Sequence, residues 1–384
     1  MESRAWLKTI LTATLILAVT TVLFLYTSGY RLDRKKNNQL DLKQTGMISA
    51  KSIPEGASVY LDAKLMTATN DTISALNPGQ YKLRIAKTGF VEWTKDVEVY
   101  PELVTDITAV LVSQTPRLEP LTNTSAQQPT ASPTLTKLAY FSNDPTTPGI
   151  SVISLAQGGL SLFKSTPALI AKDVPTQKYS LSKSIQWSPD EQTLLVEGQA
   201  NNFFVVNLAK DTVEATASPQ LLKNTWLTEL LKKRTDFIQK LDLPEEIKRL
   251  ATDPNTLWAP DEKKFLYTKK NGETTEYWVY NMEKPIPVGE KVDNLVFVTK
   301  TKDSQPKVTW YADSFHLILV ENYDDKAKKG TLSLIRIDGT NKTEIYNNTL
   351  YSDTVYSSPG GDKLIILTSY KSNAQTDLYT VGIR

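Results

Sequence analysis

The sequence predicts an all-β protein with an N-terminal transmembrane helix, a small β-sandwich domain, and a β-propeller-like domain that carries a helical insertion. Three observations lead to this prediction. One uncharged apolar segment lies near the N-terminus, apolar residues alternate with polar ones between Met47 and Ser113, and an aromatic-turn-strand unit recurs in the C-terminal half. Alternation with period two indicates strands, and a recurring unit indicates a repeat architecture.

The composition limits the chemistry that the chain can perform. A length of 384 residues gives room for two or three domains. The 44 Lys and Arg residues against 42 Asp and Glu leave a formal charge of +2, so we expect no nucleic-acid partner. The chain has no cysteine and a single histidine, His316. Disulfides and thiolate metal sites are therefore excluded, and we expect no metal, no cofactor and no catalytic residue set.

The N-terminal region predicts a single-pass membrane anchor. After a tail at 1–8, residues 9–30 form a run of 22 residues without a formal charge. A helix of about 20 apolar residues crosses a hydrocarbon core of about 30 Å. Trp6 lies at one end of this run, with Tyr26 and Tyr30 at the other, as aromatic residues at membrane interfaces do.

Basic residues around the anchor leave its processing and orientation open. Arg4 and Lys8 form a basic start for a cleaved signal peptide, which is the alternative to an anchor. The juxtamembrane segment 31–46 opens with four basic residues: Arg31, Arg34, Lys35 and Lys36. Counted literally, this excess keeps the C-terminal part on the cytoplasmic side, although long domains translocate regardless of such a bias.

Residues 47–113 predict a small β domain. Val59 and Leu61 alternate with polar residues, and apolar side chains occupy the odd positions from Tyr81 to Ile85. A Pro-Gly pair at 78–79 and a Thr-Gly pair at 88–89 lie where tight turns are needed. This pattern is typical of a sheet with one buried and one solvated face.

Two stretches of this domain resemble the PEGA domain family. They are Ile53-Pro54-Glu55-Gly56-Ala57-Ser58-Val59-Tyr60-Leu61-Asp62, and Leu76-Asn77-Pro78-Gly79-Gln80-Tyr81 with the later Gly89-Phe90 and Trp93. Ala63 departs from the family's usual glycine, and Thr69-Asn70 from its Thr-Pro pair, which concerns turn geometry. The resemblance implies an all-β module of the cell envelope, next to a membrane anchor or an S-layer-type partner, without catalytic residues. On this ground we expect the C-terminal domains to be extracytoplasmic.

Residues 114–136 are expected to form a linker. The segment is rich in Thr, Ser, Pro and Gln, as in 123–133. Such a composition buries little apolar surface, so we expect an extended spacer here.

Residues 137–384 predict a β-propeller-like domain. An apolar strand, a turn and a second apolar strand recur around four motifs: Trp187-Ser188-Pro189-Asp190, Trp258-Ala259-Pro260-Asp261, Trp310-Tyr311-Ala312-Asp313 and Tyr356-Ser357-Ser358-Pro359-Gly360-Gly361-Asp362. Further strands follow each motif, and four strands per unit are typical of propeller blades. The turn motif resembles that of TolB-like and WD40-like propellers. With 138–155 as a blade that lacks the motif, we expect about five blades.

A helical insertion is expected at about 218–250. Apolar residues such as Trp226, Leu230 and Phe237 recur there at spacings of three and four, and Leu243-Pro244 predicts a break. Packing against the ring is one role for these helices, and a partner-binding or lid element is the other.

The candidate catalytic and metal-binding residues favour structural roles. His316 opens a predicted strand, where we expect it to face solvent. The repeated Asp190, Asp261, Asp313 and Asp362 suggest metal ligands, but their place in turns favours carboxylates that bond their own backbone. Residues 322–325 resemble a calcium loop, whereas the lysines around them favour a solvated hairpin tip.

The sequence therefore favours a non-catalytic envelope scaffold over an enzyme. We expect the membrane to be contacted through the N-terminal helix, and the propeller to present a surface for an envelope protein or a glycan. The alternative is an extracytoplasmic hydrolase with an active site on propeller loops, which would need carboxylate pairs there.

Overall fold

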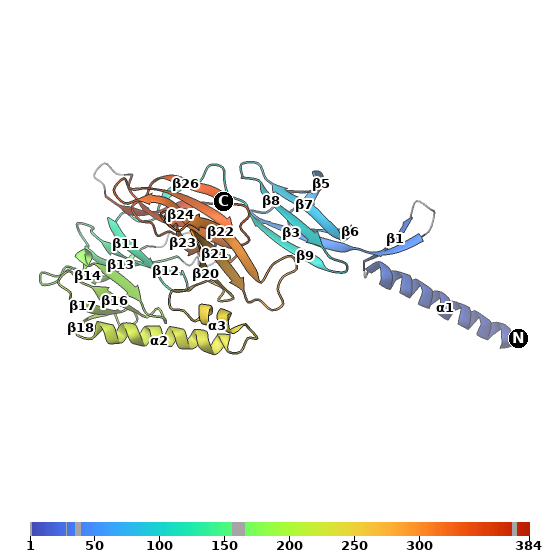
Figure 1. Cartoon of the computed structure of the whole chain (residues 1–384), viewed down its shortest axis with the longest axis horizontal. Coiled ribbons are helices and arrows are strands. Elements are labelled where there is room, and N and C mark those ends of the chain that lie inside the picture. Colours follow the sequence, from blue (N-terminus) through green and yellow to red (C-terminus); the bar gives the residue numbers. More distant parts are fainter. Residues whose placement is uncertain (1, 28, 35–39, 156–165, 371–374) are drawn as a thin grey trace. The chain divides into compact units, whose positions relative to one another are not determined.

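The computed structural model describes the chain except residues 1, 28, 35–39, 156–165 and 371–374 (Figure 1). The chain divides into two compact units, one of Met1–Leu111 with Pro285–Glu290 and one of Val112–Lys284 with Lys291–Arg384. The predicted all-β class is confirmed, because 47% of the chain is strand and 14% is helical.

The N-terminal apolar segment forms helix α1 (Glu2–Thr27). Its stretch Ile10–Thr27 has a mean hydropathy of 2.1 and is nowhere buried. The hydroxyls of Thr14, Thr20 and Thr21 donate to carbonyls four residues earlier, which satisfies these polar groups within the apolar helix. The helix is long and apolar enough to cross a membrane, a property that a signal sequence shares.

A β-hairpin occupies the expected juxtamembrane segment. It consists of β1 (Tyr30–Arg34) and β2 (Leu40–Gln44), paired from Tyr30 opposite Gln44. The Gln44 amide donates to Glu102 at 2.7 Å, and the Thr45 hydroxyl donates to the Gly29 carbonyl at 2.5 Å. These bonds join the hairpin to the small β domain within the first unit.

The small β domain is a sandwich of two sheets. The strands are β3 (Gly46–Ile53), β4 (Ser58–Leu61), β5 (Lys64–Ala68), β6 (Asp71–Leu76), β7 (Gly79–Ala86), β8 (Trp93–Val99) and β9 (Val104–Val110). One sheet has the order β6-β3-β9 and the other β5-β4-β7-β8. Leu83, Ile85 and Trp93 are buried in the shared core, whereas the alternating Lys82 and Arg84 are not. The predicted alternation is therefore confirmed.

The turn between β4 and β5 has a left-handed backbone. Asp62 has φ +46° and Ala63 has φ +69°. Glycine adopts this conformation without a steric cost, whereas a residue with a Cβ atom does not. The structure thus keeps the turn for which the PEGA family usually has glycine, and it holds alanine there under strain.

The described residues of the second unit form five four-stranded sheets, which are the blades of a propeller. Blade 1 is β11 (Ala126–Ala131), β12 (Lys137–Ser142), β13 (Gly149–Ser154) and β14 (Ala168–Lys172), and blade 2 is β15 (Ser184–Trp187), β16 (Thr193–Glu197), β17 (Phe203–Asn207) and β18 (Thr212–Thr216). Blade 3 is β19 (Leu257–Trp258), β20 (Lys264–Asn271), β21 (Thr274–Asn281) and β22 (Asp293–Lys300), and blade 4 is β23 (Lys307–Trp310), β24 (His316–Asp324), β25 (Lys329–Arg336) and β26 (Thr343–Thr349). Blade 5 is β27 (Tyr356–Ser357), β28 (Lys363–Thr368), β29 (Asp377–Gly382) and β10 (Leu118–Pro120). A short 3₁₀ helix, η1 (Tyr179–Leu181), precedes β15. The predicted blade without the turn motif is confirmed as blade 1.

Blade 5 joins the two ends of the second unit. Its order is β10-β29-β28-β27, so a strand from near residue 118 completes a sheet made of the C-terminal strands. The buried carboxylate of Asp377 accepts a hydrogen bond from the Thr122 hydroxyl at 3.1 Å, and the Leu378 N–H donates to that hydroxyl at 3.0 Å. The start and the end of the propeller are thereby fastened together.

The expected linker at 114–136 was wrong, because it contains β10 and β11. Ala126 is fully buried, and β11 pairs with β12 along most of its length. Pro129 lies at the irregularity between Gln127 and Thr130, where the ladder needs no N–H from it. Composition misled here because the stability of these strands comes from backbone pairing with neighbouring strands more than from their own side chains.

The predicted helical insertion is confirmed as α2 (Pro219–Ile238) and α3 (Glu245–Ala251), which lie side by side (Figure 1). Near its start, α2 places Lys223 Nζ 5.5 Å from the ring centre of Phe203 in blade 2. Near its end, Phe237 packs edge-on against Trp258 in blade 3, with 6.2 Å between ring centres. The insertion therefore packs against both neighbouring blades.

Candidate functional site

The repeated aspartates are turn residues, as predicted. Asp190 accepts the N–H of Gln192 at 3.0 Å, and Asp261 accepts that of Lys263 at 2.9 Å. The hydroxyl of Ser188 also donates to Asp190, and this bond is the main reason that the pKa of Asp190 lies below its usual value. Asp362 likewise accepts from the Ser358 hydroxyl at 2.7 Å. These carboxylates close their own turns.

His316 is buried, so the expectation that it faces solvent was wrong. Its side chain is 2% exposed, and Nδ1 lies 2.7 Å from Asp313 Oδ2. The ring also meets Tyr311 edge-on at 6.1 Å, and the Tyr311 hydroxyl donates to the carbonyl of Gly361 in the next blade. The reason is the turn itself: a residue three positions after the turn aspartate can fold back onto its carboxylate.

Lys264 occupies the same position in blade 3 and is also buried. Its ammonium group lies 2.7 Å from Asp261 and 3.2 Å from Glu283, and 4.1 Å from the ring centre of Phe315 in blade 4. This buried ion cluster escaped the sequence reasoning. The signal that could have found it is the spacing of Asp261 to Lys264 and Asp313 to His316, a cationic or basic side chain three residues after each aspartate.

The stretch 322–325 is a hairpin tip rather than a calcium loop. Asp324 accepts the N–H groups of Lys326 and Ala327, at 2.8 and 3.0 Å, and Asp325 pairs with Lys328 at 2.6 Å. Within the described parts of the chain, no group of three or more acidic, histidine or cysteine side chains is placed to hold a metal ion.

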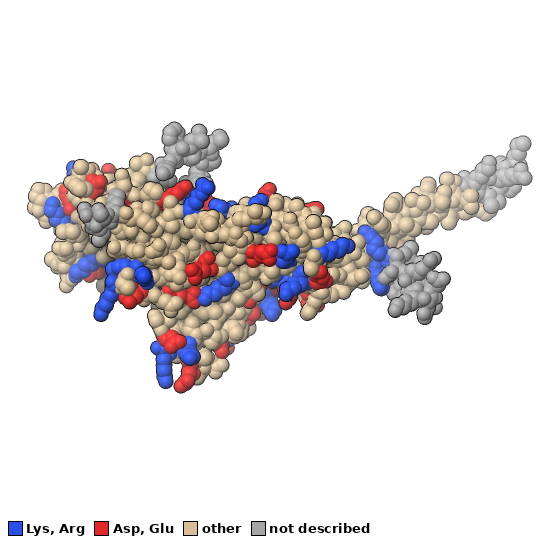
Figure 2. Space-filling model, turned by 90° about the horizontal axis from the view of Figure 1, so that it is seen from above, with Lys and Arg blue, Asp and Glu red and all other residues tan. Residues whose placement is uncertain are grey.

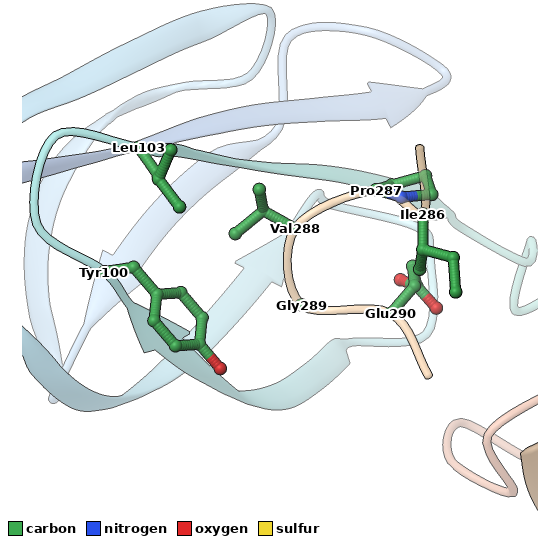
Figure 3. A pocket seen from close by; sticks show the side chains of 7 residues that line it. All are labelled: Tyr100, Leu103, Ile286, Pro287, Val288, Gly289 and Glu290. Carbon is green, nitrogen blue, oxygen red and sulfur yellow. The ribbon is translucent and has the colours of Figure 1, made fainter. Parts of the chain in front are cut away.

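A pocket of about 310 Å³ lies in the first unit, lined by Tyr100, Leu103 and residues 286–290 (Figure 3). Glu290 forms an ion pair with Lys95 at 3.4 Å, and both side chains are at least nine-tenths buried. The pair anchors the segment 285–290 within this unit. The pocket lies along the edge of the segment 285–290. Its one charged lining residue, Glu290, already forms an ion pair with Lys95.

A second candidate site lies at the junction of blades 4 and 5, where the hydroxyls of Tyr346 and Tyr370 meet and Lys328 lies near the ring of Tyr351. We call it the blade 4–5 surface; it comprises Tyr323, Asp325, Lys328, Tyr346, Tyr351, Asp353 and Tyr370. The tip between β24 and β25, the loop between β26 and β27, and the end of β28 form it because they lie at the same end of their blades. The Leu350 N–H donates to the Lys328 carbonyl at 2.8 Å, and the Thr368 hydroxyl to the Thr349 carbonyl at 2.6 Å.

Tyr370 is the most exposed of the four tyrosines of this surface, at 54%. Its hydroxyl lies 3.1 Å from that of Tyr346, which in turn donates to the Thr349 carbonyl at 2.8 Å. Its ring packs on Tyr379, with 5.2 Å between ring centres. Both ends of the side chain are therefore fixed while one side remains open to solvent.

Tyr323 and Tyr346 of this surface are neutral at physiological pH. Burial, followed by the hydrogen bond to Asp325, raises the pKa of Tyr323 to about 12. Burial and the contact with Tyr370 raise the pKa of Tyr346. The ammonium of Lys328, 5.8 Å from the ring centre of Tyr351, also lowers the pKa of Asp325 through their hydrogen bond. Over the visible face of the molecule, basic and acidic side chains are interspersed (Figure 2).

An apolar N-terminal helix, a two-sheet sandwich and a five-bladed propeller place the chain in the class of all-β proteins with a PEGA domain and a β-propeller. The PEGA domain family matches residues 45–115, which confirms the resemblance seen in the sequence. The comparison with curated proteins finds no match.

Solved propeller structures show similarity at low identity. TolB from Acinetobacter baumannii is 16% identical, with 79% of this chain and 60% of that chain covered and a TM-score of 0.26. The TolB-type protein from Agrobacterium tumefaciens is 14% identical, with 67% and 73% covered and a TM-score of 0.24. The propeller domain of the trilobed protease from Pyrococcus furiosus is 11% identical, with 88% and 96% covered and a TM-score of 0.24. Because these TM-scores are low, the propeller assignment rests on the strand order of the five sheets. The chain spans 60% of the length of the first of these proteins.

Proposed function

We propose that the chain is a single-pass membrane-anchored, non-catalytic protein of the cell envelope, whose propeller presents a surface for a protein or a glycan. The blade 4–5 surface is the observation that carries this proposal. It combines an exposed, fixed aromatic ring with hydrogen-bonding groups of both charges. Binding sites typically join apolar or aromatic area to a few placed polar groups.

The non-catalytic role is supported by the engagement of the reactive side chains. His316 and Lys264 lie inside blade seams, where each pairs with the aspartate of its own turn. A general base must come within hydrogen-bonding distance of a substrate proton, which a side chain buried in this way does not do. Asp190, the turn aspartate of blade 2, likewise bonds its own turn.

The envelope placement is supported by two features of the first unit. The PEGA match at residues 45–115 is separated by one short hairpin from an apolar helix that is long enough to span a bilayer. Protease shielding of intact cells that carry a C-terminal tag tests the placement. External protease should remove the tag while a cytoplasmic control protein survives. Protection of the tag until the membrane is opened contradicts an extracytoplasmic propeller.

Turnover assays test the non-catalytic role. The full-length chain in lipid nanodiscs is incubated with panels of peptides and glycans, and we expect no turnover of either. Turnover that disappears when Asp325→Asn and Asp353→Asn are combined contradicts the proposal and favours a hydrolase on propeller loops. Asp236→Asn on the exposed side of α2 is the control, because it removes a carboxylate charge away from the blade 4–5 surface.

A further inference from the structure

We propose that the blade 4–5 surface binds a neutral saccharide, with the ring of Tyr370 as its stacking platform. This inference rests on the proposed function and names the class of ligand for the same surface. It is carried by a fixed, exposed ring with the Tyr346 hydroxyl beside it, and by the carboxylates of Asp325 and Asp353 on the same surface.

The geometry of Tyr370 suits a sugar ring. A sugar presents flat faces of C–H groups that pack on aromatic rings, with hydroxyls around the rim. The Tyr370 ring is held by Tyr346 at its hydroxyl and by Tyr379 against its body. A ring that is already fixed loses little side-chain entropy when a ligand stacks on it.

The carboxylates of the blade 4–5 surface suit hydroxyl donors. Asp353 accepts from the Thr354 hydroxyl at 3.1 Å, and Asp325 accepts from Lys328 and Tyr323. An ionised carboxylate has about four lone-pair positions, so each can accept further bonds from ligand hydroxyls. The hairpin tip carries two aspartates (324 and 325) and three lysines (326, 328 and 329), and Asp353 follows in the loop between β26 and β27. This balance favours an uncharged ligand over a strongly anionic or cationic polymer.

The surface is less suited to a peptide ligand. Among the described residues beyond 298, Tyr370 is the only large hydrophobic side chain in the exposed class. Peptides that dock as helices need a groove with several apolar anchors three and four residues apart. One exposed ring with polar neighbours supplies one stacking position and several hydrogen bonds, which is what a sugar needs.

Isothermal titration of the full-length chain in lipid nanodiscs tests the inference; sugar-based detergents are avoided because they would compete. The probes are cellotetraose and the tetramer of N-acetylglucosamine. We expect at least one to bind in the millimolar range or tighter. Tyr370→Ala should weaken that binding at least ten-fold, whereas Tyr370→Trp should restore most of it. Val298→Ala, which truncates a similarly exposed residue on β22, is the matched control and should bind like the parent chain.

Absence of binding by the parent chain at millimolar probe overturns the saccharide assignment, and so does an equal loss in the Val298→Ala control. Thermal unfolding of each variant shows whether Tyr370→Ala is folded. If it is not folded, the saccharide affinity of Tyr346→Phe is compared with that of the parent chain instead. That variant keeps the ring and removes the hydroxyl that fixes Tyr370, so it should weaken binding about two- to five-fold. Unchanged binding then overturns the inference. A protein adduct formed through position 370 without saccharide binding refutes this inference alone and leaves the proposed function standing.

Discussion

The indole N–H of Trp258 donates to the carbonyl of Ala251 at 2.9 Å, so the motif tryptophan of blade 3 is bonded to helix α3. In the other blades the same position bonds an innermost strand of a neighbouring blade. Trp187 donates to Thr130 and Trp310 to Leu257, at 3.0 and 2.9 Å. For Trp258, helix α3 therefore supplies the carbonyl acceptor that a strand of a neighbouring blade supplies for Trp187 and Trp310.

Replacement of Trp258 with Phe should destabilise the second unit by about 1–3 kcal/mol. The variant keeps an aromatic ring but leaves the buried Ala251 carbonyl without this donor. Urea unfolding followed by circular dichroism measures the loss. Trp278→Phe is the control, because Trp278 donates to the more exposed Glu276 and its loss should cost less. Equal destabilisation by both variants contradicts a special role for the Trp258 bond.

Thr122→Val should loosen the closure of blade 5. The variant removes the hydroxyl that bonds both Asp377 and the Leu378 N–H, and it leaves the Asp377 carboxylate buried with one donor fewer. We expect a loss of about 1–3 kcal/mol and faster hydrogen exchange of the β10 and β29 amides. The control is Thr212→Val on the exposed start of β18, which should change neither the stability nor the exchange of the β10 and β29 amides. Exchange that rises uniformly over all blades argues against a local clasp.

Asp313 should contribute stability that is lost in acid. Burial acts to raise its pKa, but His316 and the N–H groups of Phe315 and His316 outweigh this and hold the pKa below the usual 3.8. A carboxyl with a depressed pKa in the folded state stabilises fully above its unfolded pKa, and the stability falls as pH drops through the folded value. Asp313→Asn should therefore be less stable at pH 7 and show a flatter decline below about pH 4. Unfolding free energies of the parent chain and Asp313→Asn, measured from pH 7 downward, check this. If the two free energies decline in parallel below about pH 4, the prediction is contradicted.

Glu290→Gln should destabilise the first unit by about 3–5 kcal/mol, because it removes the carboxylate that pairs with the buried ammonium group of Lys95. The control is Asp106→Asn, which breaks the half-exposed pair with Lys51 in the same unit. Exposed pairs contribute at most about 1 kcal/mol, so this variant should unfold almost like the parent chain. Denaturant unfolding of both variants gives the comparison. A similarly small loss of unfolding free energy in both variants would contradict the packing of segment 285–290 in the first unit.

Ala63→Gly should stabilise the first unit by roughly 0.5–1 kcal/mol. The substitution relieves a left-handed residue of its Cβ clash, and the gain is partly offset by the freedom of glycine in the unfolded chain. Thermal unfolding measures the change. Ala86→Gly, within strand β7, should destabilise instead and serves as the control. A loss of stability in Ala63→Gly contradicts the strained turn.

Most of the fold could be predicted because its patterns are local. Alternation at 81–85 and the Trp-x-Pro-Asp turns each report a strand pair from neighbouring residues. The strand β10 could not be predicted in this way, because its partner β29 lies more than 250 residues away in the chain and its own residues look like a linker. Burial of His316 likewise depends on how a side chain folds back over its turn, which a strand pattern does not show.

The blade 4–5 surface was missed for a related reason. Its tyrosines come from a hairpin tip, an edge strand and two loops, so no regular spacing joins them. The signal that was available is compositional: seven of the 17 tyrosines lie between Tyr311 and Tyr379. Enrichment of tyrosine in one stretch favours a binding surface, since tyrosine gives large contact area with a polar end.

Site-specific photo-crosslinking on intact cells tests the central claim most directly. A benzophenone amino acid is placed at position 370 in the full-length chain, and at position 298 as the control. The account predicts an adduct, to a glycan or a protein of the envelope, from position 370 and none from position 298. No adduct from position 370, or the same adducts from both positions, would contradict a binding role for the blade 4–5 surface.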